Sequence, residues 1–379
     1  MKKLIAARLV RLAVSGVAAV TLVAGAADAA LGHAKDRVKD PKLKHGTLTV
    51  DGSGADDTIA LRLGAGRPDT LQVDANGTVF SFRRADVENI VVDAGGGNDA
   101  VRVDEANGVF TDTIPTILYG GDGNDNLAGG TGAETLLGGD GNDTVDGNRG
   151  NDQAQLGAGD DTFVWDPGDG SDTIEGDTGN DTLRFNGANV AEKVTLAANG
   201  SHLLFTRDVA TITMDTHGVE HVDFNALGGA DTVNIGDLGA TDVTNVGVNL
   251  AASGGAGDGS ADQVNVKATN DADVVTVSGT AAAGVHVAGL AATVDITGGE
   301  AANDALKIDA LDGADVVTAA GLAGDALALT VDGGNGADVL VGSAGNDTLL
   351  GGEGDDVLEG GPGQDVLDGG PGSNVVIQD

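Results

Sequence analysis

The stretch Gly120–Ala128, GGDGNDNLA, opens a run of nine-residue units with the pattern GGxGxDxUx, where U is a large apolar residue. The units that follow are GGTGAETLL, GGDGNDTVD, GNRGNDQAQ and LGAGDDTFV. A second run begins at Gly333 and reads GGNGADVLV, GSAGNDTLL, GGEGDDVLE, GGPGQDVLD and GGPGSNVVI. A Gly/Asp-rich linker has no reason to keep an apolar residue at every eighth place, so both runs predict stacked β-rolls.

The eighth position supplies the predicted core, and we expect it to be the only position that points inward. It holds Leu127, Leu136, Val145, Ala154 and Phe163 in the first run and Leu340, Leu349, Leu358, Leu367 and Val376 in the second. One unit buries too little apolar surface to be stable alone, so the units must stack. The glycines allow positive φ angles and a close approach of backbone carbonyls to a cation.

The sixth position carries a carboxylate or amide in every unit: Asp125, Glu134, Asp143, Asp152 and Asp161, then Asp338, Asp347, Asp356, Asp365 and Asn374. If two units form one coil, equivalent residues stack about 4.8 Å apart. Asp125, Asp143 and Asp161 then form one column, and Glu134 and Asp152 the opposite one. Two unit charges at this spacing repel by about 1 kcal/mol in water and about 3 kcal/mol at an effective dielectric near 20, so a cation is needed between the turns. Oxygen-only ligands in a flexible loop favour Ca²⁺ over Mg²⁺ or Zn²⁺.

Both runs resemble the RTX, or haemolysin-type, calcium-binding repeat family, whose members form parallel β-rolls with Ca²⁺ between adjacent GGxGxD turns. The resemblance implies carboxylate ligands at Asp125, Asp143, Asp152, Asp161, Asp338, Asp347, Asp356 and Asp365. The predicted metal site also includes Asp181 and the turn residues Gly121, Gly123, Gly139, Gly141, Gly334, Gly336, Gly352 and Gly354. We expect weak binding or capping where the pattern is broken, by Glu134, Asn148 with Arg149, Leu156 and Asn374.

The composition is that of an acidic, calcium-loaded chain. It contains 59 Asp and Glu against 20 Lys and Arg, a formal net charge of -39, 64 Gly, 2% aromatic residues and no Cys. Such a chain lacks the positive patch that nucleic-acid binding requires, so no nucleic-acid partner is expected. Without disulfides, extracellular stability would have to come from metal ions and repeat stacking.

The N-terminus predicts export. A basic start, an apolar stretch from Leu12 to Ala27 and the A-x-A sequence Ala27-Asp28-Ala29 indicate a cleaved secretory signal peptide at residues 1–29. The alternative is an uncleaved membrane anchor, but the apolar run is shorter than the ~20 residues that span a bilayer. No transmembrane segment is expected after cleavage, and residues 30–46 are expected to be a linker.

The remaining segments, 47–118 and 186–332, read as degenerate solenoid repeats around a β-roll at 119–185 and a C-terminal one at 333–379. The stretch Glu88–Val103 aligns without a gap to Glu220–Ile235, and Leu306–Gly321 echoes both. The expected fold is therefore all-β, a right-handed parallel β-roll or β-solenoid. The sequence leaves open whether the turn residues Asp57, Asp99, Asp231, Asp273, Asp304 and Asp315 bind metal, because Asp also stabilises tight turns without an ion.

One motif suggests zinc hydrolysis. His217–His221 reads HGVEH, the HxxEH pattern of inverted zincins. The surrounding residues alternate with period two and the motif contains a glycine, which indicates strand and turn rather than helix. We therefore expect no enzyme, but a secreted protein that binds several Ca²⁺ ions and folds on binding them. The alternatives are a calcium-stiffened cell-surface adhesin or envelope scaffold with a polysaccharide or protein partner and, less favoured, a polysaccharide-active β-helix enzyme.

Overall fold

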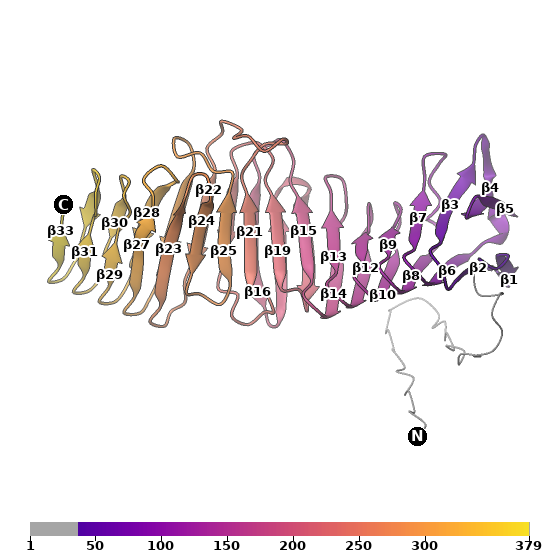
Figure 1. Ribbon diagram of the computed structural model, residues 1–379, viewed down its shortest axis with the longest axis horizontal. Helices are drawn as coiled ribbons and strands as arrows, with labels where there is room; N and C mark the ends of the chain where they lie inside the picture. The colour runs from indigo at the N-terminus through magenta and orange to yellow at the C-terminus, as the bar shows by residue number, and fades with distance from the viewer. Residues whose placement is uncertain (1–36, 379) are drawn as a thin grey trace, which may run out of the picture.

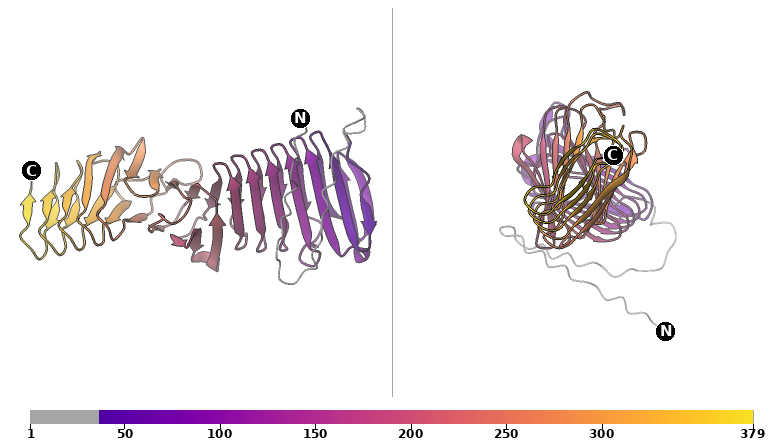
Figure 2. Two further views of the ribbon diagram at one scale, coloured as in Figure 1. Left: turned by 90° about the horizontal axis from the view of Figure 1, so that it is seen from below. Right: turned by 90° about the vertical axis from the view of Figure 1, so that its left-hand side faces the viewer.

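The computed structural model describes residues 37–378, which form 33 β-strands and two short 3-10 helices, η1 (Arg84–Asp86) and η2 (Val209–Thr211). The strands lie in two sheets that face each other along one elongated stack, from the indigo N-terminal end to the yellow C-terminal end in Figure 1. Viewed along the stack in Figure 2, the coils superimpose as a flattened ring. The all-β solenoid prediction is confirmed.

The first sheet contains 16 strands in this spatial order: β1 (Lys42–Lys44), β2 (Thr47–Ser53), β6 (Asn89–Gly96), β8 (Thr116–Asp122), β10 (Thr135–Asp140), β12 (Gln153–Ala158), β14 (Thr173–Thr178), β18 (Ile212–His217), β17 (His202–Arg207), β16 (Lys193–Asn199), β20 (Thr232–Ile235), β22 (Gln263–Lys267), β26 (Ala305–Asp309), β28 (Ala328–Asp332), β30 (Thr348–Leu350) and β32 (Val366–Asp368).

The second sheet pairs the other strands in the order β5 (Thr78–Arg83), β4 (Arg67–Ala75), β3 (Thr58–Gly64), β7 (Ala100–Asp104), β9 (Asn126–Ala128), β11 (Thr144–Asp146), β13 (Thr162–Trp165), β15 (Thr182–Asn186), β19 (His221–Asn225), β21 (Asn245–Asn249), β25 (Thr293–Thr297), β24 (Gly284–Ala288), β23 (Val274–Thr280), β27 (Val316–Leu322), β29 (Val339–Val341), β31 (Val357–Glu359) and β33 (Val375–Ile377).

In the β-rolls the chain alternates between the two sheets, and two nonapeptides make one coil. Thr144 pairs with Asn126 on one side and Thr162 on the other, which is the predicted eighteen-residue register. The eighth-position side chains fill the space between the sheets, and Leu127, Leu136 and Val145 are fully buried. Near the middle of the stack the core becomes aromatic, with the rings of Trp165 and Phe185 stacked at a centroid distance of 4.0 Å.

Two expectations about the core were wrong. The sixth position is buried as well as the eighth, since Asp143 and Asp161 are 2% and 1% exposed. Conversely, the final coil does not bury its apolar residues: Val376 is 49% exposed and Leu367 is only partly buried. Among residues 37–378, β33 is the last strand of the stack in Figure 1, and no further described coil covers these side chains.

The stack is also not parallel throughout. Three antiparallel meanders are inserted: β3–β4–β5 at the N-terminal end, β16–β17–β18 in the first sheet and β23–β24–β25 in the second. In the two internal meanders the third strand pairs in parallel with the preceding coil, β18 with β14 and β25 with β21. The two aligned segments, 88–103 and 220–235, each follow a meander: the first comes after β3–β4–β5 and η1, and the second comes after β18, with η2 lying between β17 and β18.

The structure moves one predicted boundary. Residues 42–44, expected in the linker, form β1 against β2, and the Lys39 amide donates to the Asp51 carbonyl oxygen at 3.0 Å. The predicted signal peptide lies outside the described residues. Within residues 37–378, no helix is long and apolar enough to cross a membrane.

Candidate metal centre: two ladders of buried carboxylates

Each strand that starts a coil segment is preceded by a turn, and the turns of successive coils stack into ladders along both sides of the solenoid. One ladder precedes strands of the second sheet and contains Asp57, Asp99, Asp125, Asp143, Asp161, Asp181 and Glu220, then, after a gap, Asp273, Asp315, Asp338, Asp356 and Asn374. The other precedes strands of the first sheet and contains Glu134, Asp152 and Asp172, then Glu192, Asp231, Asp262 and Asp304, then Asp347 and Asp365.

Neighbouring ladder residues are joined by one repeated hydrogen bond. The backbone amide of each residue donates to a side-chain oxygen of the equivalent residue one coil further on, as from Asp125 to Asp143 Oδ1 at 2.8 Å and from Glu134 to Asp152 Oδ1 at 2.6 Å. The predicted columns, Asp125 with Asp143 and Asp161 and Glu134 with Asp152, are therefore confirmed. Asn374 closes its ladder by accepting from the Asp356 amide at 2.8 Å.

The second carboxylate oxygen is the unusual feature of these ladders. In eleven aspartates it is buried and has no hydrogen-bond partner among the described residues: Asp99, Asp125, Asp143, Asp152, Asp161, Asp172, Asp181, Asp231, Asp315, Asp338 and Asp356. A buried polar atom without a partner costs about 1–3 kcal/mol, and more if it is charged. Repetition at eleven turns indicates that a ligand completes them.

The electrostatics of the ion-free chain agree with this interpretation. Burial, together with neighbouring carboxylates, raises the pKa of Asp143 to about 7 and that of Asp152 to about 9. Burial also raises the pKa of Asp172 and Asp181 to about 7. The folded chain thus disfavours the charged form unless a positive charge is supplied.

Backbone carbonyls supply the other oxygens. A Cβ added at Gly139 would lie 2.0 Å from the Gly121 carbonyl oxygen, and one added at Gly141 would lie 2.1 Å from that of Gly123. These carbonyls enter the space between coils that only glycine leaves free. Among the described residues no group of three or more His, Cys, Asp or Glu side chains could hold a metal. A cation between coils would therefore be bound by single carboxylates and backbone carbonyls, an oxygen-only set that fits Ca²⁺.

The predicted site residues occupy these turns. Gly121, Gly123, Gly139, Gly141, Gly334, Gly336, Gly352 and Gly354 all have positive φ angles, from 89° to 153°. Asp125, Asp143, Asp152, Asp161, Asp181, Asp338, Asp347 and Asp356 are at most 3% exposed. Two predicted ligands have no buried oxygen without a partner. Asp347 accepts from both the amide and the hydroxyl of Ser343, and Asp365 is half-buried and accepts from Gln378 Nε2 at 2.8 Å.

Sequence reasoning missed the ladder residues Asp172, Glu192, Glu220 and Asp262. A two-residue insertion precedes the unit that contains Asp172, so a strict nine-residue register fails there, and its ladder bond spans 20 residues. Glu192 and Asp262 each stand at the sixth position of a short glycine-initiated turn. The hydrogen bonds that link them to the next ladder residue, however, span 39 residues to Asp231 and 42 residues to Asp304. A search that allowed insertions between turns would have found Asp172, Glu192 and Asp262.

The HxxEH motif is strand and turn, as expected. His217 ends β18 in the first sheet, and His221 begins β19 in the second. His217 Nδ1 lies 3.1 Å from Glu175 Oε2, whereas Glu220 accepts from the Asp181 amide and so belongs to a ladder.

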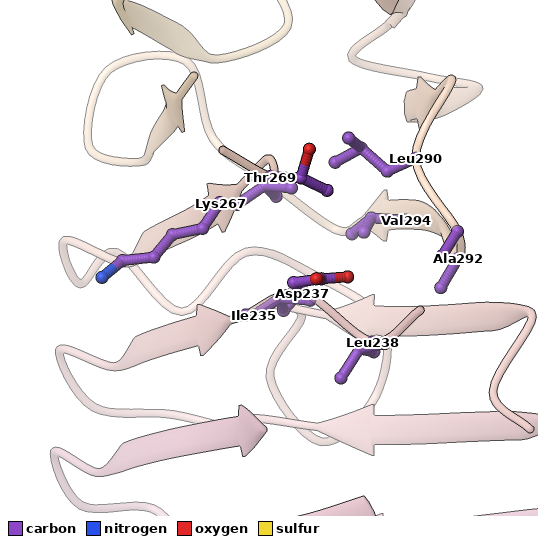
Figure 3. A pocket seen from close by; sticks show the side chains of 11 residues that line it. Ile235, Asp237, Leu238, Lys267, Thr269, Leu290, Ala292 and Val294 are labelled. Atoms are coloured by element: carbon purple, nitrogen blue, oxygen red, sulfur yellow. The ribbon is translucent and has the colours of Figure 1, made fainter. Parts of the chain in front are cut away.

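The pocket in Figure 3 lies between strands of both sheets and is lined by Ile235, Lys267, Leu290 and Val294, among others. Its volume is about 20 Å³, room for little more than one water molecule. In the view of Figure 3 the Lys267 amino group points away from Asp237, so the pocket does not combine these two charges.

Comparison with known proteins identifies the repeats. A family model of the RTX calcium-binding nonapeptide repeat, four copies long, matches residues 119–154, 129–163, 166–187, 332–367 and 341–376. These segments cover almost all of the first predicted β-roll, residues 119–185, including Asp181, and residues 333–376 of the second. RTX nonapeptide repeats bind Ca²⁺, so calcium is the ion that the ladders accommodate. No curated protein is matched by this sequence.

Proposed function

Because residues 119–187 and 332–376 are RTX calcium-binding repeats, we propose that this chain is a secreted protein that binds several Ca²⁺ ions and acquires its folded solenoid structure as it does so. The eleven buried carboxylate oxygens without partners carry the proposal. In the absence of an ion they oppose folding, and in its presence they become ligands. Ion binding is thereby linked to folding.

Export gives this linkage a role. Free calcium is low inside cells, so the chain would remain open and competent for export, and extracellular modules bind calcium at about 10⁻⁴–10⁻³ M. One site at about a hundredfold excess over its dissociation constant contributes roughly 2.7 kcal/mol to folding, and several such sites would decide the equilibrium. The N-terminal sequence of residues 1–29 supports secretion by a cleaved signal peptide.

A calcium titration followed by far-UV circular dichroism tests this proposal, with Mg²⁺ as the control ion. We expect a cooperative gain of β-sheet signal with Ca²⁺ alone. A double variant, Asp143→Asn with Asp161→Asn, should require more calcium for the same signal, because it removes two adjacent carboxylates from one ladder. A chain that is already β-rich in chelator and unchanged by Ca²⁺ would refute folding on binding.

We propose a non-enzymatic role. The HxxEH histidines lie in different sheets, so they do not project from one helix as the ligands of an inverted zincin would. The second candidate function is that of a calcium-stiffened surface adhesin or envelope scaffold, which the elongated stack in Figure 1 favours. Recovery of the protein in the cell-surface fraction, and its release by chelator, would support this candidate over a freely released protein.

A further inference from the structure

Seventeen of the twenty ladder carboxylates fall into two structural classes, and the residue four positions before the carboxylate separates them. Glu220, Asp262 and the half-buried Asp365 are assigned to neither class. In the first class the amide of that residue donates to the carboxylate, as Ser53 does to Asp57 at 2.7 Å and Ser343 to Asp347 at 2.6 Å. The same bond closes the turns of Glu134, Glu192, Asp273 and Asp304, from Gly130, Ala188, Thr269 and Glu300. We call these six turns closed.

In the second class the residue four positions earlier has a positive φ angle, and its amide does not donate to the carboxylate. This class contains all eleven aspartates with an unpartnered oxygen. The residues at the earlier position are Gly95, Gly121, Gly139, Asn148, Gly157, Gly168, Asp177, Leu227, Leu311, Gly334 and Gly352, with φ between 58° and 126°. None of the six closed turns has a positive φ at this position. We call these eleven turns open.

Among these ladder aspartates, the backbone conformation at this position therefore separates carboxylates that the protein satisfies from carboxylates with an oxygen left for a ligand. The two closed glutamates differ, because Glu134 Oε1 and Glu192 Oε2 are buried without a partner although their turns are closed. Three open turns lie outside the segments that the RTX repeat model matches, those of Asp99, Asp231 and Asp315, while the closed turn of Asp347 lies inside one. On the basis of the function proposed above, we propose that the turns of Asp99, Asp231 and Asp315 bind Ca²⁺ and that the turn of Asp347 does not.

The Asp315 turn combines an unpartnered carboxylate oxygen with a backbone carbonyl between the coils. A Cβ added at Gly334 would lie 1.9 Å from the Leu311 carbonyl oxygen. Gly121 and Gly95 show the same relationship at 2.1 Å, in the coils of Asp125 and Asp99. Asp315 is fully buried, and its backbone amide donates to Asp338 Oδ1 at 2.8 Å. The degenerate turn is thus continuous with the C-terminal β-roll.

Two of the earlier residues are leucines, Leu227 before Asp231 and Leu311 before Asp315, with φ of 69° and 78°. An aliphatic side chain rarely adopts this conformation, which glycine adopts freely. Asp231 is 2% exposed and its free oxygen is buried. At both turns the open conformation is kept although the residue disfavours it, and the carboxylate that it leaves unpartnered is the group a cation would bind.

The test counts calcium ions bound per chain, by equilibrium dialysis of the full-length protein, in single Asp→Asn variants. Asn374 already accepts a ladder hydrogen bond from Asp356, so an amide is compatible with the stack. We expect Asp315→Asn and Asp231→Asn each to lose about one ion or to weaken binding at least tenfold. The matched controls Asp304→Asn and Asp347→Asn should bind as many ions as the unaltered chain.

Stability in chelator, measured in a stabilising osmolyte so that the ion-free chain is folded, provides an independent readout. Asp315→Asn removes an unpartnered buried carboxylate and should raise the unfolding midpoint. Asp304→Asn should lower it, because Asp304 accepts from the amides of both Asp262 and Glu300 and one of these bonds is lost. Folded Asp315→Asn, Asp231→Asn and Asp99→Asn proteins that keep all their ions, or an Asp347→Asn protein that loses one, would overturn the inference. An unaltered chain that binds no calcium would instead contradict the proposed function.

Discussion

Single glycines in the turns control how closely two coils approach each other. Gly139 has a φ of 126°, and its hypothetical Cβ would lie 2.0 Å from the Gly121 carbonyl oxygen. No side chain fits that space without moving the backbone of the neighbouring coil. The glycine of the repeat therefore serves stacking and also frees a carbonyl for the cation.

Gly139→Ala should separate adjacent coils and weaken calcium binding, with a loss of at least about 1–3 kcal/mol from the disfavoured φ alone. The control is Gly254→Ala, where φ is 116° but no atom lies within 4 Å of the added Cβ. Both variants carry a similar conformational penalty, so the difference between them isolates the contact with Gly121. Urea denaturation with and without Ca²⁺ measures it, and equal losses would show that this contact is unimportant.

The antiparallel meanders interrupt the carboxylate ladders. The first-sheet ladder stops at Asp172, where β16–β17–β18 is inserted, and resumes at Glu192. At Glu192 the positive charge comes from the protein itself: Arg207 of β17 contacts Glu192, with Nε at 2.9 Å from Oε1. Both residues are less than 5% exposed, and the guanidinium carbon lies 5.2 Å from the Trp165 ring centroid.

Arg207→Met should destabilise the chain by about 3–5 kcal/mol, because it leaves the Glu192 carboxylate buried without its cation. Adding Glu192→Gln should recover part of that loss, since the charge is then removed as well. The control is Arg184→Ala, which breaks an exposed pair with Asp223 at 3.7 Å and should cost less than about 1 kcal/mol. Thermal unfolding in saturating calcium is the measurement, and an Arg207→Met effect as small as that of the control would show that the pair is unimportant.

The sequence predicted the elements that obey the nine-residue period and failed where the period changes. Asp125, Asp143 and Asp161 could be placed in one column because eighteen residues separate each pair. The meanders could not be placed, because a strand such as β17 has the same alternation whether it pairs in parallel or antiparallel. The sequence also could not predict whether a turn is open or closed. Leu311 has a positive φ in an open turn although leucine does not favour it, whereas Gly130, a residue type that favours positive φ, lies in a closed turn without one.

At the scale of the whole molecule, the ladders make stability depend on protons as well as calcium. Burial raises the pKa of Asp99, Asp143, Asp172, Asp181 and Asp231 to about 7, from an ordinary value of 3.8. In the ion-free chain the folded state therefore binds more protons than the unfolded state between these two values. The contribution of these groups is fully present below pH ~3.8 and is lost as the pH rises through about 7.

Without calcium, the chain should therefore become less stable from pH 5 to pH 8, and with saturating calcium this trend should diminish or reverse because the ion binds the deprotonated carboxylates. Repulsion across a net charge of -39 also grows with pH. It acts mainly between exposed charges and is screened at about 1 M salt, where the Debye length is roughly 3 Å, whereas the buried ladders are screened much less. Thermal unfolding at high salt, in calcium and in chelator with a stabilising osmolyte that keeps the ion-free chain folded, separates the two effects. Ion-free stability that stays constant or rises between pH 5 and pH 8 at high salt would mean that the ladder carboxylates are not held in the buried, proton-binding state that the structure shows.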